Sequence, residues 1–273
     1  MISVIIPAHD EAALIGGCLS ALLASDPVPV PVEVIVVANG CRDETVAIAQ
    51  GFRDAARARG WAFTVLDLPG LGKPGALNAG DAAARHPARV YLDADVTLSP
   101  GVMAEVWQAL DREEPAYASG TVRITGQGAA ARAYARLWSR VPFMAEGVPG
   151  CGLFAVNGPG RARWVAFPPI ISDDTFVRLQ FAPSERHRVE APYDWPIAEG
   201  LAALVRVRRR QDAGVAEIER LYPESLANDD KRRLGPRGKL ALALGDPLGF
   251  LTYTGVALAV RILPAPKGWS RGR

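Results

Sequence analysis

Residues 90–95 read Val90-Tyr91-Leu92-Asp93-Ala94-Asp95, in which a short apolar run ends in two carboxylates one residue apart. A short segment that is apolar at successive positions is typical of a strand covered on both faces of a parallel sheet. Unpaired charge at the end of such a strand is costly, so the two acids favour a ligand there. Their hard oxygen atoms suit Mg²⁺ or Mn²⁺ held jointly with a diphosphate.

Three earlier segments share this apolar, strand-like character: Val4–Ile6, Val32–Val37 and Ala62–Leu66. The segments between the apolar runs have helical spacing and are Glu11–Ala24, Asp43–Arg59 and Pro74–Arg85. This alternation predicts βαβ units with right-handed crossovers, and hence an α/β protein with a Rossmann-like, mostly parallel sheet flanked by helices. Ligands of such sheets bind beyond the carboxyl ends of the strands, so the residues that follow each run are the site candidates.

Beyond residue 95 the pattern is less regular. We predict a helix to about Arg112, a strand over Ala116–Ile124, an amphipathic segment over Ala129–Glu146 and a glycine-rich loop over Gly147–Asn157. The pattern further predicts a helix over Asp173–Phe181, a strand over Leu201–Val207 and a helix over Arg208–Tyr222.

Composition places the chain among globular proteins, since 49% of its 273 residues are hydrophobic and 22% are charged. A net charge of 31 − 29 = +2 argues against a dedicated nucleic-acid binder. Cys18, Cys41 and Cys151 show neither CxxC spacing nor an even number, so we expect reduced thiols in a cytoplasmic protein. The strand-like start at Ile2 argues against a signal peptide.

The C-terminal quarter is basic, because residues 201–273 carry 14 basic and 7 acidic side chains. Its apolar stretch Leu240–Val260 is about as long as a bilayer crossing, roughly 20 residues, but Asp246-Pro247 interrupts it. Basic residues come directly before that stretch: Lys231, Arg232, Arg233, Arg237 and Lys239. Two interpretations stay open, a helical segment peripheral on the cytoplasmic face of the cell membrane or a helix packed on the protein's own core.

The motifs at the predicted strand ends resemble, in order, those of the family 2 inverting glycosyltransferases, which have the nucleotide-diphospho-sugar-binding fold called GT-A. Residues 3–11 resemble the opening strand and turn, residues 36–45 the end of the second strand, and residues 72–80 the Gly-Lys loop. Asp93-Ala94-Asp95 is similar to the DxD motif and Asp173-Asp174-Thr175 to the later ED motif. The five motifs cover roughly residues 1–182.

This resemblance implies transfer of one sugar from a nucleotide-diphosphate sugar to an acceptor hydroxyl with inversion, in the synthesis of cell-surface polysaccharide or glycolipid. The partners would be the nucleotide sugar and a saccharide acceptor. The basic and apolar C-terminus favours a lipid-linked acceptor, and the net charge argues against nucleic acid as a partner. Residues 1–222 would form a single GT-A catalytic domain, with residues 1–95 as its nucleotide-binding half and 96–222 as its acceptor side. Residues 223–273 would be a basic and apolar extension. The chain lacks the QxxRW motif of processive synthases, which favours adding one sugar.

The resemblance also implies roles for individual positions. Asp174 would be the catalytic base with Asp173 as its supporting acidic neighbour, and Asp95 would hold Mn²⁺ or Mg²⁺. Lys73 would approach the diphosphate. The other donor-binding positions would be Pro7, Ala8, Glu11, Asn39, Asn78, Asp93 and Ala94. Many relatives carry aspartate where this chain has Asn39, so the base of the donor stays open.

Arg208 and Arg210 are further candidates, because guanidinium groups pair bidentately with phosphates. An exposed basic face or a patch for lipid head groups is an equally good interpretation of these arginines. Tyr134, Trp138, Phe143 and Met144 recur at helical spacing, which is typical of core residues and is also compatible with an aromatic wall that faces the acceptor.

Two other functions stay open. A sugar-phosphate nucleotidyltransferase uses a related sheet but needs a glycine-rich, arginine-containing loop after the first strand, where this chain has Ala8-His9-Asp10-Glu11-Ala12. A catalytically silent, membrane-associated protein that binds nucleotide sugars would keep the fold. The presence of Asp95 and Asp174 argues against that alternative.

Overall fold

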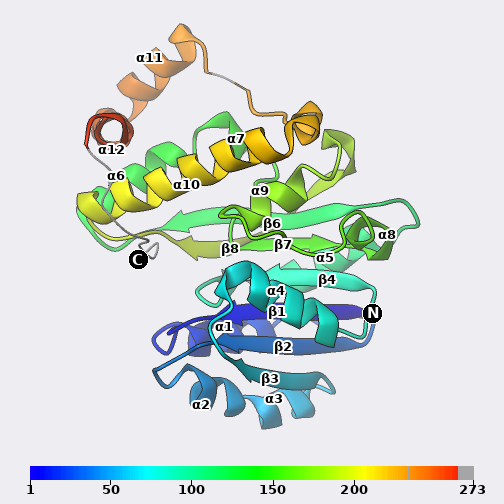
Figure 1. Ribbon diagram of the computed structural model, residues 1–273. Coiled ribbons are helices and arrows are strands. Elements are labelled where there is room, and N and C mark those ends of the chain that lie inside the picture. Colours follow the sequence, from blue (N-terminus) through cyan, green and yellow to red (C-terminus); the bar gives the residue numbers. More distant parts are fainter. Residues whose placement is uncertain (233, 264–273) are drawn as a thin grey trace.

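A computed structural model describes residues 1–232 and 234–263 of the chain, built around one eight-stranded sheet (Figure 1). The strand order is β3-β2-β1-β4-β7-β6-β8-β5. The strands are β1 (Ile2–Ala8), β2 (Val32–Asn39), β3 (Ala62–Leu68), β4 (Ala88–Leu92), β5 (Thr97–Leu98), β6 (Tyr117–Thr125), β7 (Leu153–Val156) and β8 (Arg186–Pro196). Neighbours are parallel from β3 to β4 and between β6 and β8, whereas β7 pairs antiparallel with both β4 and β6. The predicted parallel sheet is confirmed over its first four strands.

Helices cover both faces of the sheet. Up to residue 145 they are α1 (Ile15–Leu23), α2 (Thr45–Gln50), α3 (Arg53–Ala58), α4 (Gly72–Ala83), α5 (Val102–Leu110), α6 (Ala129–Trp138) and α7 (Pro142–Ala145). After it come α8 (Gly158–Arg161), α9 (Asp173–Arg178), α10 (Leu201–Leu221), α11 (Pro236–Gly245) and α12 (Pro247–Ile262), with the 3-10 turns η1 (Pro183–Glu185) and η2 (Pro223–Asn228).

Alternate residues of each central strand enter two separate cores, which explains why the strands are apolar at successive positions. In β1, Val4 and Ile6 pack with α1 and α5 on one face, whereas Ile5 packs with α4 on the other face. A third, smaller core joins α6, α10 and α12 through Tyr134, Leu204 and Val256.

The strand predicted over Leu201–Val207 is wrong, because these residues begin the 21-residue helix α10. A short apolar run does not distinguish a strand from a helix segment, and the buried residues Leu204, Gly214 and Ile218 recur here at helical spacing. The segment is also rich in alanine, leucine and arginine, which favour helix.

Other boundaries also differ from the sequence expectations. The helix predicted over Asp43–Arg59 is divided into α2 and α3, with Gly51 at the end of α2. The segment Ala129–Glu146 is divided into α6 and α7, because Val141 precedes Pro142 and is therefore extended. The glycine-rich segment Gly147–Asn157 contains strand β7, which the sequence analysis did not predict.

The C-terminal segment folds back onto the rest of the protein. Helix α12 packs against α6 and α10 (Figure 1). The carboxylate of Asp246 accepts a hydrogen bond from the Gly249 amide at the start of α12 and pairs with Arg136 of α6 at 3.2 Å. In the described part of the chain, no helix has the length and apolar character that crossing a bilayer requires.

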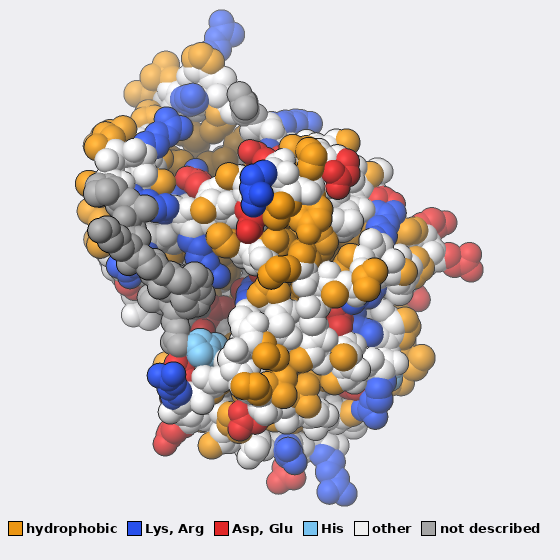
Figure 2. All heavy atoms as spheres, viewed as in Figure 1, with side chains coloured by type: hydrophobic (Ala, Val, Ile, Leu, Met, Phe, Trp, Pro, Cys, Tyr) orange, Lys and Arg blue, Asp and Glu red, His pale blue; other side chains and the backbone are white. Residues whose placement is uncertain are grey.

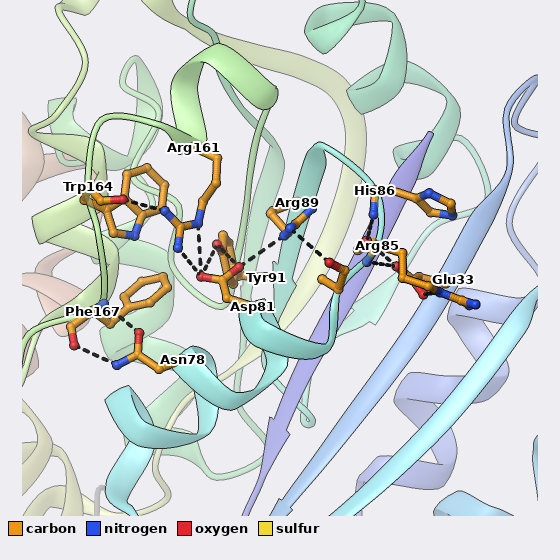
Figure 3. A network of polar contacts seen from close by, with 12 residues as sticks. Glu33, Asn78, Asp81, Arg85, His86, Arg89, Tyr91, Arg161, Trp164 and Phe167 are labelled. Atoms are coloured by element: carbon orange, nitrogen blue, oxygen red, sulfur yellow. Dashed lines mark hydrogen bonds and ion pairs between the residues drawn. The ribbon is translucent and has the colours of Figure 1, made fainter.

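An ion-pair network fixes helix α4 against its neighbours (Figure 3). The carboxylate of Asp81 on α4 pairs with Arg89 of β4 at 3.2 Å and with Arg161 of α8 at 2.9 Å. It also accepts a hydrogen bond from the Tyr91 hydroxyl at 2.9 Å. The side chain of Asp81 is only 8% exposed. The network therefore holds the helix whose first turn contains Lys73.

We expect Asp81→Asn to lower the free energy of unfolding by about 3 kcal/mol, because it leaves two largely buried guanidinium groups without their carboxylate. Urea denaturation measures this change. Asp67→Asn is the matched control, since Asp67 is exposed on β3 and a surface substitution of this kind changes stability by about 0.5 kcal/mol or less. Equal losses in the two variants would contradict the assigned role of Asp81.

Candidate active site

A cleft of about 650 Å³ lies beyond the carboxyl end of β4, between the residues that follow this strand and helices α9 and α10. Its charged lining includes side chains from distant parts of the chain, namely Lys73, Asp93, Asp95, Asp173, Asp174, Arg208 and Arg210. Each of them is a candidate from the sequence analysis. The tertiary structure therefore brings the two acidic motifs, the loop lysine and the two arginines together.

Lys73 bridges the two acidic motifs. Its Nζ atom lies 2.9 Å from Oδ1 of Asp93 and 3.2 Å from Oδ2 of Asp173. Burial acts to lower the pKa of Lys73, but Asp173 and Asp93 outweigh this effect and raise that pKa above its ordinary value. Lys73 is therefore a permanent cation between carboxylates, and its side chain remains 34% exposed to the cleft.

Asn39 and Gly40, at the end of β2, hold the loop that carries Lys73. The Asn39 side chain accepts a hydrogen bond from the Leu71 amide at 2.7 Å and donates one to the Gly72 carbonyl at 3.0 Å. The loop passes so close that a Cβ atom on Gly40 would lie 2.8 Å from the Gly70 nitrogen. Gly40 also has a φ of 70°, which glycine adopts without strain. These two residues position the cation of the cleft.

The chain turns sharply after β4 and presents two carboxylates to the cleft. The Asp93 amide donates to the Gly152 carbonyl at 2.8 Å, and the Val96 amide donates to the Asp93 carbonyl at 3.1 Å. Ala94, between the two acids, is 3% exposed and packs into the core. Asp93 and Asp95 both line the cleft as a result.

Asp173 and Asp174 form the first turn of α9 and differ in their surroundings. Asp173 is 4% exposed and pairs with Lys73, whereas Asp174 is partly exposed and its Oδ1 atom accepts a hydrogen bond from the Thr175 amide at 2.6 Å. Burial raises the pKa of Asp173 to about 6, with Lys73 opposing this rise and Asp174 adding to it. Burial also raises the pKa of Asp174. Asp174 thus combines access to the cleft with increased basicity.

The carboxylate oxygens of Asp95 fit a hard divalent cation that would also bind a substrate. Carboxylate oxygen is a preferred ligand of Mg²⁺ and Mn²⁺. In residues 1–232 and 234–263, the cleft brings no three acidic, histidine or cysteine ligand atoms within 4.8 Å of one another. A cation at Asp95 would therefore take most of its ligands from a diphosphate and from water, which is common for Mg²⁺.

One other group of ligand atoms lies at the ends of β1 and β2. His9, Asp10 and Cys41 each offer a ligand atom within 4.8 Å of the others. Nδ1 of His9 also lies 2.6 Å from the Asn39 carbonyl oxygen. The sequence analysis did not identify this group, because its members come from two separate segments.

Aromatic side chains form a wall of the cleft. Trp138 of α6 lies 5.4 Å from Trp195 of β8 between ring centroids, and Tyr134 stacks on Tyr253 of α12 at 5.0 Å. All four residues line the cleft. Phe143 also lines it, whereas Met144 is buried and does not. Tyr134 and Met144 are buried, as the core interpretation requires, whereas an aromatic wall that faces the acceptor stays a prediction for Trp138 and Phe143.

The arginines of α10 have different neighbours. Arg208 pairs with Asp212 at 2.8 Å and donates a hydrogen bond to the Tyr253 hydroxyl at 3.0 Å. Arg209 donates to the Leu263 carbonyl at 2.8 Å. Arg210 also lines the cleft.

The remaining predicted donor-binding residues do not line this cleft in the part of the chain that the structure describes. They are Pro7, Ala8, Glu11, Asn39, Asn78 and Ala94. Pro7 and Ala8 pair in register with Val37 and Ala38, so they lie next to Asn39 at the carboxyl edge of the sheet. The Asn78 side chain makes two hydrogen bonds to the backbone of Phe167, at 2.9 and 2.7 Å, and clamps that loop onto α4 (Figure 3).

The sequence analysis missed Trp195, Tyr253 and Lys231 as residues of the cleft. Trp195 had a detectable signal, because Val189, Ala191, Tyr193 and Trp195 alternate with more polar residues as a half-buried strand requires. No local signal identifies Tyr253 or Lys231, which the return of the C-terminal segment brings to the site.

Comparison with protein families gives one match. The sequence model of the family described as Glycosyl transferase family 2 matches residues 3–162, which is more than half of the chain. Among curated proteins, no sequence matches this chain at a significant level.

Several solved structures have a similar fold. The mannosyltransferase PcManGT from Pyrobaculum calidifontis, in complex with GDP-Man and Mn²⁺, is 18% identical with a TM-score of 0.58, over 97% of this chain and 76% of that one. TarS 1–349 from S. aureus is 17% identical with a TM-score of 0.59, over 96% of this chain and 75% of that one. Glucosyl-3-phosphoglycerate synthase from Mycobacterium tuberculosis, in complex with Mn²⁺, UDP and glucosyl-3-phosphoglycerate, is 20% identical with a TM-score of 0.51, over 84% and 81%. Identities this low show the fold alone, and they confirm the predicted GT-A architecture.

Proposed function

This chain belongs to glycosyl transferase family 2, and we propose that it transfers one sugar from a nucleotide-diphosphate sugar to an acceptor hydroxyl with inversion at the anomeric carbon. One observation carries the proposal. Asp95 and Asp174, which are distant in sequence, line the same cleft together with the cation of Lys73.

In the proposed reaction, the acceptor oxygen attacks the anomeric carbon while the bond to the diphosphate oxygen breaks on the opposite face. The nucleoside diphosphate leaves with the bonding electron pair, and Asp174 takes the proton of the acceptor hydroxyl. Its raised pKa suits this role, because a base is most effective when its pKa lies near the working pH. Burial raises the pKa of Asp174 and the negative charge of Asp93 adds to this rise, while Asp173 is the acidic neighbour that pairs with Lys73.

The leaving diphosphate requires positive charge. Lys73 supplies a fixed cation, and Arg208 and Arg210, which also line the cleft, add guanidinium groups. Asp95 would hold a Mn²⁺ or Mg²⁺ ion, whose chemistry is to neutralise the negative charge that develops on the diphosphate. The Mn²⁺ and nucleotide ligands of the structural neighbours support this part of the proposal.

The aromatic wall suits a saccharide acceptor. The apolar faces of sugar rings pack on indole rings, and Trp138 and Trp195 offer two of them beside the acidic residues. We propose that the acceptor is a saccharide or lipid-linked saccharide on the cytoplasmic side of the cell membrane, and that the product enters a cell-surface polysaccharide or glycolipid.

A thermal-shift screen of UDP, GDP and dTDP sugars, each with and without Mn²⁺, tests the proposed donor. We expect one nucleotide to raise the Tm, and more strongly with Mn²⁺, because a ligand at about 100 times its Kd stabilises the native state by about 2.7 kcal/mol. The matching nucleoside monophosphates are the control. If no diphosphate raises the Tm, the donor assignment is wrong. If a donor binds but is neither transferred nor hydrolysed, the chain is the silent binding protein instead.

A further inference from the structure

Helices α11 and α12 present an apolar surface away from the protein, which we call the outward face. Its residues are Leu240, Leu244, Leu248, Leu251, Leu258 and Ile262, each between 57% and 74% exposed. Figure 2 shows hydrophobic side chains gathered over α11 and α12, with lysine and arginine side chains among them. Single exposed leucines are ordinary, but a contiguous set on consecutive helices marks an interaction surface.

Helix α12 cannot turn its outward face into the core, because its other face is already used. Val256 is 2% exposed and packs with α6 and α10. At the start of the helix Asp246 pairs with Arg136, and at its end Arg209 bonds to the Leu263 carbonyl. Leu248, Leu251, Leu258 and Ile262 recur at helical spacing on the opposite side. The sequence analysis left core packing and membrane contact as alternatives. The face of α12 with Val256 packs on the core, and the opposite face suits membrane contact.

The charges around the outward face are positive. Arg237, Lys239 and Arg261 are exposed, and no ion pair is seen for them among residues 1–232 and 234–263. The acidic residues nearest to this face in the chain pair with arginines of the protein itself. Asp229 and Asp230 pair with Arg178 at 2.7 and 2.8 Å, and Asp246 pairs with Arg136.

We propose that the outward face docks on an anionic phospholipid surface, with its leucines at the acyl boundary and its cations at the head groups. Apolar side chains flanked by uncompensated lysine and arginine are what such a surface binds. A second copy of the chain fits less well, because a two-fold interface would bring the same cations against one another.

Docking would place the catalytic cleft beside the lipid surface. Tyr253, on the inner side of α12, lines the cleft and accepts a hydrogen bond from Arg208 at 3.0 Å. The helix that would touch lipid on one side therefore contributes to the site on the other. This consequence rests on the proposed function, and it favours a lipid-linked acceptor.

Flotation with vesicles tests the docking in the absence of any substrate. The full chain should float with vesicles of phosphatidylcholine and phosphatidylglycerol and much less with phosphatidylcholine alone. Leu251→Glu combined with Leu258→Glu should lower the partition coefficient by about tenfold or more. Arg237→Gln with Lys239→Gln should lower it by about fivefold for each charge removed, and only on the anionic vesicles.

Matched controls exclude general effects of the substitutions. Val165→Glu introduces one glutamate, against two in the leucine variant, at a residue that is 97% exposed between α8 and α9, and Arg53→Gln with Arg57→Gln removes two exposed cations from α3. Both controls should float like the wild type, and each variant should keep the wild-type Tm. Asp174→Asn should also float normally, which separates failure of docking from failure of the proposed reaction.

Three results would overturn the proposal. The first is a wild-type chain that does not float with anionic vesicles. The second is equal flotation of the wild type and the double leucine variant. The third is a wild-type dimer in light scattering that this variant converts to monomers, which would assign the outward face to a second copy of the chain.

Discussion

Asp174→Asn is expected to lower kcat/KM for sugar transfer by about 10²–10⁴-fold, the usual contribution of a general base. Asparagine keeps the shape of the side chain and has no carboxylate to accept the hydroxyl proton. Protein stability should not fall, because burial disfavours the charged form of Asp174, and the substitution removes one negative charge from a cluster that also contains Asp93 and Asp173. Steady-state transfer assays with matched thermal melts measure both effects.

The pH profile of the wild type provides a second test of the same residue. The base acts in its deprotonated form, so activity should rise with pH, and its acidic limb should lie above the ordinary carboxylate range. Burial raises the pKa of Asp173 to about 6 and shifts that of Asp174 in the same direction. Glu219→Gln, an exposed cleft residue without an assigned role, should leave rate and profile unchanged. Near-normal turnover by Asp174→Asn would remove the assigned base.

Asp95→Ala is expected to lower sugar transfer by about 10³-fold, because the carboxylate that would hold the cation against the diphosphate is lost. The loss should be accompanied by loss of the Mn²⁺-dependent part of the donor thermal shift, whereas any metal-independent donor binding should remain. Asp95 lies at the partly exposed lining of the cleft, so the shorter side chain opens no sealed cavity in the core.

Asp194→Ala is the matched control for this substitution. Asp194 also carries a partly exposed carboxylate, but it pairs with Arg123 at 2.7 Å and does not line the cleft. It should keep both the transfer rate and the response to Mn²⁺. A wild-type enzyme that transfers sugar equally well in excess chelator, or an Asp95→Ala enzyme that still responds to Mn²⁺, would contradict the metal assignment.

The sequence alone determined the parallel part of the sheet and the chemical groups of the candidate site. Strands β1, β2 and β4 contain runs of successive apolar residues and β3 a shorter, partly exposed one, and each is followed by a polar or glycine-containing turn. These signals are local, because the period of apolar residues and the turn chemistry depend on neighbours a few positions apart. The acidic pairs 93–95 and 173–174 and Lys73 are therefore identifiable as candidates from the residues around them in the chain.

Only the tertiary structure decided which of these groups meet. The order of the later strands and the position of Tyr253 depend on contacts between residues far apart in the chain, which no local pattern records. Asn39 and Asn78 show the same limit, since their amides hold the backbone of loops that arrive from elsewhere. The chemistry that a side chain can perform depends on its type, but its role depends on the residues that the fold places around it. The surroundings of Asp173 and Asp174, beside Lys73 and shielded from water, exist only after folding.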